Sequence, residues 1–457
     1  MRLFLLAVLM IVLPAQVAPV DTVITNPTAD ALFPWGDGKA AAFDDLFALP
    51  YRTSFSADWL YLRDRAGNLS HVRLPDLFDY NDRANAEYVL SSRTDLWIWS
   101  GVLGRSTLRH YHLSGDGILP DQATLVSALP IGDHDTRPGG LIRLASGALA
   151  GMWYEHTYFD DRHIDLGFLY VSPAGELSTL YPVRGDGNWG SPVMSEMTLV
   201  QHPADGSIWT FYKRDSYHEL GAARLIEEAG RLRLDWLNPG FISKADGGNS
   251  PEGEYPYIIA APDPQRNTIR LAYQNTQYNF LYIADAQGNY INGSCGDPGP
   301  GVLEVNLFAK GAYVSVAEIA ANGAKSFTVF PTYIERAWYF GLSVSDGIWL
   351  FYQQIGCQNT TFASLRAGPV YASHFKGAWS APIPVGEISA SKDYYASTIL
   401  YDVGRPEFVM RLSDDLVHDV ILTPPESLSL TLVDFSAWSS TVHEFVGHVA
   451  NLILALR

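Results

Sequence analysis

The chain has 457 residues, of which 47% are hydrophobic and 18% are charged, so it carries enough apolar material for an extensive core and is not generally disordered. The formal net charge of −18 argues against a nucleic-acid-binding protein, because contact with a phosphate backbone needs a basic face. A local basic pocket stays compatible with this charge, since salt screens charges more than about 10 Å apart. The 58 aromatic residues (25 Tyr, 21 Phe and 12 Trp), with 39 Gly and 27 Pro, favour a β-rich extracellular protein.

The first element along the chain is an apolar run, Leu3–Leu13, which follows Arg2. This run is too short to cross a bilayer comfortably and predicts a secretory signal peptide over residues 1–18. An uncleaved N-terminal anchor is the alternative. We expect no other membrane span and a secreted, periplasmic or cell-surface location. Residues 19–45 are expected to form an N-terminal segment containing a strand that could close a ring of sheets.

A short pattern recurs along residues 46–430: a turn with Gly, Asp or Asn, then a strand of alternating apolar and aromatic residues. The copies are ADWLYLRD (57–64), TDLWIWSG (94–101), GALAGMWYEH (147–156), DGSIWTFYKRD (205–215), NTIRLAYQN (267–275), DGIWLFYQQ (346–354) and PEFVMRLSDD (406–415). Several copies follow another apolar strand and a turn, which indicates hairpins. Three or four antiparallel strands repeated about seven times predict an all-β fold, a seven-bladed β-propeller in residues 46–430. A pair of β-sandwiches or a parallel β-helix is the alternative.

The C-terminal segment, residues 431–457, contains one helical pattern, with apolar residues three and four apart between about 440 and 456. Within it, HEFVGH (443–448) looks like a zinc-protease motif. His443 and His448 are five positions apart, however, which separates them by about 140° around a helix. They cannot easily share a tetrahedral metal. We therefore expect no metal-dependent chemistry and no cofactor, although a structural calcium ion remains possible.

The two cysteines of the chain are Cys295 and Cys357. In an oxidising compartment a lone pair of cysteines usually forms one disulfide, which is the prediction here. Two free buried thiols are the alternative.

Histidines concentrate in the third repeat. His134 precedes one strand and His156 ends the next, so a hairpin would bring them to the same rim. Arg137 and Tyr154 would lie beside them. The fourth and fifth repeats place polar residues at the equivalent ends of their strands: Glu196, Lys213, Arg214 and His218, then Tyr273, Gln274 and Asn275.

The segments DHDTRPGGLIRLASGALAGMWYEH, SPVMSEMTLVQHPADGSIWTFYKRD and PYIIAAPDPQRNTIRLAYQNTQYNFLYIADAQGNYING resemble consecutive blades of the BNR-repeat family. That group includes the propeller polysaccharide lyases that act on ulvan and related uronic-acid glycans. The resemblance covers residues 130–293. It implies that His134 and His156 stand at the family's two histidine positions. Glu196 stands where the family has a tyrosine, and Lys213 or Arg214 where it has an arginine that neutralises the uronate.

The chemistry implied is β-elimination next to a uronate, which needs a base with a pKa near neutrality, a cation and a proton donor. The catalytic candidates are His134, His156, Tyr154 and Glu196. The substrate-binding candidates are Arg137, Lys213, Arg214, His218, Tyr273, Gln274 and Asn275. We expect a polysaccharide partner and a lyase; a hydrolase using Asp133, Glu155 or Glu196 is less favoured. The alternative from another class is a non-catalytic glycan-binding or scaffold propeller.

Overall fold

A computed structural model describes the strands and many of the turns that join them. The described residues are 19–24, 32–34, 41–44, 46–53, 58–64, 68–74, 86–102, 105–114, 117–118, 124–126, 135–156, 164–183, 197–213, 220–242, 258–276, 282–284, 303–306, 312–329, 340–344, 346–353, 368–388, 397–398, 407–411 and 416–422. All of them belong to one compact unit, Val17–Thr423. The expected signal peptide and the expected C-terminal helix lie outside the described residues. None of the described residues forms a helix that is long and apolar enough to cross a membrane.

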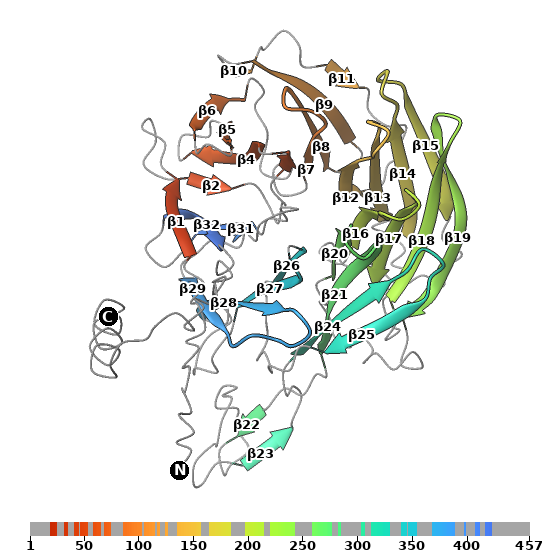
Figure 1. Cartoon of the computed structure of the whole chain (residues 1–457). Coiled ribbons are helices and arrows are strands. Elements are labelled where there is room, and N and C mark those ends of the chain that lie inside the picture. The colour runs from red at the N-terminus through yellow and green to blue at the C-terminus, as the bar shows by residue number, and fades with distance from the viewer. Residues whose placement is uncertain are drawn as a thin grey trace, which may run out of the picture. The chain divides into compact units, whose positions relative to one another are not determined.

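Six sheets of four or five strands, here called blades 1 to 6, are each built from one continuous stretch of chain (Figure 1). Blade 1 contains β2 (Leu32–Pro34), β3 (Ala41–Phe43), β4 (Leu46–Thr53), β5 (Asp58–Arg63) and β6 (Leu69–Arg73). Blade 2 contains β7 (Ala86–Leu90), β8 (Asp95–Val102), β9 (Arg105–Ser114), β10 (Gly117–Ile118) and β11 (Thr124–Val126). Blade 3 contains β12 (Asp135–Arg143), β13 (Leu149–His156), β14 (Ile164–Val171) and β15 (Leu177–Val183).

The same arrangement continues through the next three blades. Blade 4 contains β16 (Met197–Gln201), β17 (Ile208–Lys213), β18 (Leu220–Glu228) and β19 (Arg231–Ile242). Blade 5 contains β20 (Ile258–Asp263), β21 (Thr268–Thr276), β24 (Ala312–Ile319) and β25 (Lys325–Val329), and a small separate sheet of β22 (Tyr282–Ala284) and β23 (Leu303–Asn306) lies between β21 and β24 in the chain. Blade 6 contains β26 (Phe340–Val344), β27 (Ile348–Gln353), β28 (Gly368–Phe375) and β29 (Ile383–Ile388).

The prediction of a seven-bladed β-propeller is wrong, because the described residues form six blades, each from one continuous stretch of chain. The last copy of the repeat supplies β31 (Glu407–Arg411) to a composite sheet, here called the terminal sheet, with the order β1-β32-β31-β30. Its other strands are β30 (Ser397–Thr398), β32 (Val417–Leu422) and, from the other end of the chain, β1 (Pro19–Ile24). The recurring pattern marks a central strand. The pattern does not indicate whether the other strands of that sheet come from the same stretch of chain.

Each pair of neighbouring sheets buries an apolar cluster of its own. The clusters join blade 1 to blade 2, then each blade to the next as far as blade 6. Two further clusters join blade 6 to the terminal sheet and the terminal sheet to blade 1. The largest buried side chains, Trp99, Trp153, Trp209 and Trp349, all come from the second strand of a blade. The sheets therefore form a closed ring held together by face-to-face burial of alternate residues.

The first strands of blades 3, 4 and 5 lie side by side and run in the same direction. A Cβ atom added at Gly140 in β12 would lie 3.0 Å from the Cβ of Leu199 in β16. Just after β12, the backbone N–H of Ala145 donates to the side chain of Gln201, the last residue of β16, over 2.8 Å. The N–H of Ala260 in β20 donates to Thr198 Oγ1 over 3.4 Å. The edges at which these first strands begin, here called the leading edges, therefore lie next to one another in blades 3 to 5.

Candidate functional site

The leading edge of blade 3 is built by the start of β12 and the end of β13. Their register pairs Asp135 with His156, Thr136 with Glu155 and Arg137 with Tyr154. Because positions two apart on a strand share a face, Asp135, Arg137, Tyr154 and His156 occupy one face of the sheet. Thr136 and Glu155 occupy the other.

The register places Asp135, the residue that follows His134 in the sequence, but not His134 itself. His156 is the cross-strand partner of Asp135, the residue next to His134 in the sequence, and directly opposed residues in antiparallel strands are about 4.5–5.5 Å apart at their Cα atoms. His134 itself lies outside the described residues. Whether the two side chains converge thus stays a prediction.

The leading edge of blade 4 lies at Met197 and at the end of β17. Met197 pairs with Tyr212, and Lys213, the last residue of β17, pairs with Leu220 at the start of β18. The side chain of Tyr212 is buried, and its ring lies over Gly221, where an added Cβ would come 2.3 Å from the ring carbon Cζ. Tyr212 is therefore a packing residue beneath this edge.

Three of the residues predicted from the sequence near blade 4, and both cysteines, fall between the described segments. Glu196 is next to Met197 in the sequence, and Arg214 follows Lys213. Glu196, Arg214, His218, Cys295 and Cys357 lie outside the described residues. Their roles and the disulfide remain predictions.

At the leading edge of blade 5, Tyr273 is opposite Ile258, the first residue of β20. Tyr273 is fully buried in the cluster between blades 4 and 5, so its ring packs in the core and does not face solvent. Gln274 and Asn275 follow it at the end of β21, where they pair with Val314 and Tyr313. The structure thus brings the predicted strand ends of blades 3, 4 and 5 to one side of the ring.

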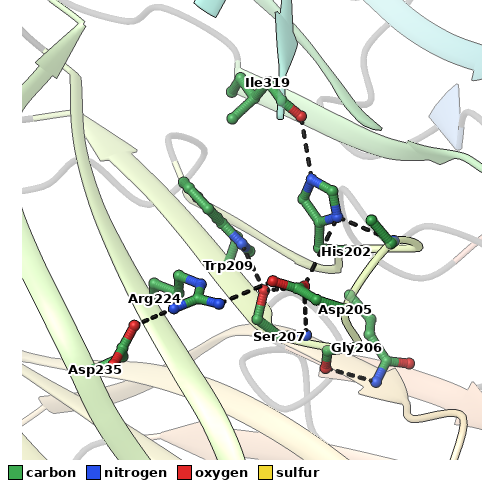
Figure 2. Close-up of polar contacts among 10 residues, drawn as sticks. His202, Asp205, Gly206, Ser207, Trp209, Arg224, Asp235 and Ile319 are labelled. Carbon is green, nitrogen blue, oxygen red and sulfur yellow. Dashed lines mark hydrogen bonds and ion pairs between the residues drawn. The ribbon is translucent and has the colours of Figure 1, made fainter. Parts of the chain in front are cut away.

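The best-defined polar network lies at the other end of blade 4, in the turn that joins β16 to β17 (Figure 2). Asp205 Oδ1 accepts hydrogen bonds from the backbone N–H and the hydroxyl of Ser207, at 3.0 and 2.6 Å. Its Oδ2 accepts from the Arg224 guanidinium over 2.8 Å. The Ser207 hydroxyl accepts from the indole of Trp209 over 2.9 Å. Burial alone would raise the pKa of Asp205, but the hydrogen bonds from Ser207 and Arg224 outweigh it and lower the pKa.

A similar network holds the turn that joins β7 to β8. Asp95 accepts hydrogen bonds from Ser92, from Thr94 and from His110 Nε2, the last over 2.9 Å, and the His110 ring stacks on Trp97 at 4.2 Å. Burial alone would raise the pKa of Asp95, but the hydrogen bonds from Ser92, His110 and Thr94 outweigh burial and lower this pKa.

Blade 6 repeats the same stacking with different residues. The ring of His374 stacks on Trp349 at 4.3 Å and hydrogen-bonds to the backbone carbonyl of Asp346 over 2.8 Å. Burial lowers the pKa of His374. The signal for these turns is local: an aspartate with a tryptophan two to four residues later, as in DGSIW and DGIW.

These networks were not predicted from the sequence, and their polar groups bond the turns to the neighbouring strands. Within the strands and turns that the structure describes, no group of three or more His, Cys, Asp or Glu side chains is arranged to hold a metal ion. We therefore place the candidate functional site at the leading edges of blades 3 to 5. A structural calcium ion stays a prediction.

Comparisons with known proteins find similarity in three dimensions only. No family model matches the chain, so the likeness to the BNR-repeat family rests on the sequence segments alone. No curated protein matches it in sequence either.

Three solved structures illustrate the structural similarity. The polysaccharide lyase Uly1 is 10% identical with a TM-score of 0.48, over 88% of this chain and 91% of its own. An oligogalacturonate lyase in complex with manganese is 10% identical with a TM-score of 0.48, over 90% and 98%. An ulvan lyase bound to -[GlcA(1-4)Rha3S]- is 9% identical with a TM-score of 0.45, over 86% and 94%. At these scores, no residue role is transferred from them to this chain.

Proposed function

We propose that this chain is a carbohydrate-active propeller that cleaves uronic-acid-containing polysaccharides by β-elimination at the leading edges of blades 3 to 5. The observation that carries the proposal is the register of β12 and β13. It pairs His156 with the neighbour of His134 and assigns Arg137 and Tyr154 to the same face of the sheet as His156. A polymeric substrate of this kind fits the expected secreted, periplasmic or cell-surface location.

The proposed reaction needs three groups. A neutral histidine, His134 or His156, removes the hydrogen alpha to the uronate carboxylate. The electron pair of that C–H bond forms the new C=C bond, and the bond from the β-carbon to the glycosidic oxygen breaks. The other histidine or Tyr154 donates a proton to the leaving oxygen. The negative charge that builds up on the carboxylate during this step needs a nearby cation.

The cationic residues proposed for this role are Arg137 on blade 3 and Lys213 or Arg214 on blade 4. Arginine can bind a carboxylate through two parallel hydrogen bonds, whereas lysine acts as a point charge. Arg137 is therefore the stronger candidate for orienting the uronate. In blade 5, the amides of Gln274 and Asn275 are suited to sugar hydroxyls, and His218 of blade 4 is a further candidate contact.

A hydrolase with Glu155 as one of its carboxylates is less well supported. The register assigns Glu155 to the face of blade 3 opposite to that of His156 and Tyr154. Glu196, which stands where the resembled family has a tyrosine, is kept as a catalytic candidate. Its ordinary pKa is near 4.3, so at neutral pH it is a poorer proton donor than a tyrosine hydroxyl.

The second candidate function is a non-catalytic glycan-binding propeller, which the replacement of the family's tyrosine by Glu196 favours. Such a protein would be expected to present aromatic side chains to the sugar. The described aromatic side chains at these edges, Tyr212 and Tyr273, are both buried. Tyr212 and Tyr273 therefore do not supply such a surface.

The test is a panel of uronic-acid polysaccharides incubated with the purified protein, read by the ultraviolet absorbance of the unsaturated product. We expect His134→Ala and His156→Ala each to reduce the rate by about 100-fold or more. Glu155→Gln is the matched control, because it changes the position next to His156 on the opposite face, and it should retain activity. Far-ultraviolet circular dichroism would confirm that each variant is folded.

Two results would contradict the proposal. Absence of product on every substrate, from a folded protein that still binds a glycan, would favour the binding propeller. Full activity of His156→Ala together with loss of activity in Glu155→Gln would exclude the proposed face of blade 3.

A further inference from the structure

Strand β12 contains an irregularity close to the candidate functional site. Gly140 pairs with Met152 of β13 and Pro138 pairs with Trp153, so Gly139 is an extra residue without a partner on β13. A β-bulge of this kind keeps the two strands paired but shifts the alternation of one strand relative to the other. The residues of β12 whose alternation is shifted are those at the leading edge.

The two faces of β13 meet different blades. Met152 packs in the apolar cluster between blades 3 and 4. The ring of Trp153 lies 6.0 Å from the ring of Trp99, in the cluster between blades 2 and 3. Because side chains alternate along a strand, the even-numbered positions of β13 occupy the face towards blade 4 and the odd-numbered positions occupy the face towards blade 2.

The bulge decides on which face Arg137 stands. With the bulge, Arg137 is opposite Tyr154 and Asp135 is opposite His156, so all four positions occupy the face towards blade 4. In an uninterrupted ladder, each residue before the bulge would pair one position further along β13. Arg137 would then be opposite Glu155, on the face towards blade 2.

Pro138 provides a physical reason for the bulge. At the turn after β12, the Leu144 N–H donates to the Ala148 carbonyl over 2.8 Å, which makes these two residues a hydrogen-bonded pair. Since hydrogen-bonded and non-hydrogen-bonded pairs alternate, an uninterrupted ladder would place residue 138 opposite Tyr154 in a hydrogen-bonded pair. Proline has no N–H to complete such a pair. The bulge moves Pro138 to the non-hydrogen-bonded position opposite Trp153.

We propose that Pro138 is a positioning residue for the candidate functional site. It enforces the bulge that assigns Arg137 and Asp135 to the blade 4 face of blade 3, together with Tyr154 and His156. The cation proposed to bind the uronate and the histidine proposed to act on it thereby stand on the same face. The effect on catalysis rests on the proposed function, whereas the register can be measured without any substrate.

Two pairs of introduced cysteines report the register. Thr136 is opposite Glu155 in a non-hydrogen-bonded pair, in which the Cα atoms are about 4.5 Å apart and a disulfide can form. Thr136→Cys with Glu155→Cys should therefore cross-link on mild oxidation. Arg137→Cys with Glu155→Cys should not, because these positions occupy opposite faces. Mass spectrometry of a protease digest identifies the linked peptides and separates them from links to Cys295 or Cys357.

The decisive variant is Pro138→Val, which supplies the missing N–H and permits the uninterrupted ladder. In this background we expect the cross-link to be lost from positions 136 and 155 and to appear between positions 137 and 155. On a uronic-acid polysaccharide, kcat/KM should fall on the order of 100-fold, because Arg137 leaves the face that carries His156.

Deletion of Gly139 provides both a rescue and a matched control. In the Pro138→Val background the deletion removes the extra residue, so Arg137 returns opposite Tyr154 without a bulge. Both the cross-link between positions 136 and 155 and most of the lost activity should return. Destabilisation by Pro138→Val alone would not be repaired by a second change. In the wild-type background, deletion of Gly139 should keep the same cross-link.

Three outcomes would overturn the proposal. The first is a cross-link between positions 136 and 155 in Pro138→Val at wild-type yield, which would show that the bulge forms without the proline. The second is a changed register with wild-type kcat/KM. The third is a cross-link between positions 137 and 155 while Pro138 is present, a measurement that stands even if Pro138→Val does not fold. Absence of activity in the wild-type protein would instead contradict the proposed function, because the cross-links measure the register directly.

Discussion

At the scale of single residues, the blades use aromatic rings to cover glycines on the neighbouring strand. The Tyr212 ring lies over Gly221, its cross-strand partner, and the Trp153 ring lies over Gly167 in the same way. Both rings are buried between blades. The glycine is needed here because the ring occupies the space that a side chain would fill.

We expect Gly221→Ala to destabilise the protein by about 1–3 kcal/mol, because the new methyl group would overlap the Tyr212 ring in a packed core. Chemical denaturation measures the change in the free energy of unfolding. In a Tyr212→Ala background the same substitution should have a much smaller effect, since the ring is gone. An equal effect in both backgrounds would show that the ring is not the cause.

At the scale of elements, single turns and side chains connect neighbouring blades. His202, in the turn after β16, donates from Nε2 to the carbonyl of Ile319 in blade 5 over 3.2 Å and accepts from the N–H of Ala204 at Nδ1 over 3.1 Å. Gln201, the last residue of β16, accepts a hydrogen bond from the backbone N–H of Ala145 in blade 3. The end of β16 and the turn after it therefore bond to the blades on both sides.

A second connection between blades 3 and 4 depends on pH. The Tyr170 hydroxyl donates to Glu227 Oε1 over 2.6 Å, and burial together with this carboxylate raises the pKa of Tyr170 to about 12. Since the pKa of a free tyrosine is about 10, the bond contributes fully below pH 10 and is lost as the pH rises from 10 to 12.

We expect Tyr170→Phe to lower the free energy of unfolding by about 1–2 kcal/mol at neutral pH, and the difference from wild type to shrink above pH 10. Denaturant titrations at neutral and alkaline pH measure this. Glu227→Gln is the control: it keeps an acceptor but removes the charge, so the pKa of Tyr170 should rise less and the alkaline loss should be smaller and complete at lower pH. A difference between Tyr170→Phe and wild type that is constant with pH would contradict the assignment.

At the scale of the whole molecule, the ring is closed by strands from the two ends of the described chain. The pairing of β1 with β32 covers the edge of β32, which would otherwise expose its backbone donors and acceptors. Since β1 begins at Pro19, directly after the expected signal peptide, any processing that preserves Pro19 leaves the terminal sheet intact.

A chain that starts at Ala18 should have full stability, whereas a chain that starts after Ile24 should lose on the order of 3–6 kcal/mol, from the several ladder hydrogen bonds of β1. Thermal unfolding of the two chains, prepared in parallel, makes the comparison. Identical midpoints would show that β1 does not contribute to closure.

The sequence by itself determined that the chain is a β-propeller and where its central strands lie. The pattern in ADWLYLRD coincides with β5, and the pattern in DGIWLFYQQ with β27, because alternation and turn residues are local properties of the chain. The neighbourhood of His156 and Asp135 could likewise be anticipated, since a hairpin with a short turn has few possible registers.

The tertiary structure alone decided the features that depend on residues far apart in the chain. Tyr273, expected to contact substrate, is buried between blades 4 and 5, because its face of β21 meets another sheet and not solvent. A ring-closing strand within residues 19–45 was expected, but its partner strand β32, the number of blades and the contact between Arg63 and Asp419 were inaccessible from the sequence. A repeat describes one strand and its turn, whereas ring closure is set by packing between strands that no local pattern connects.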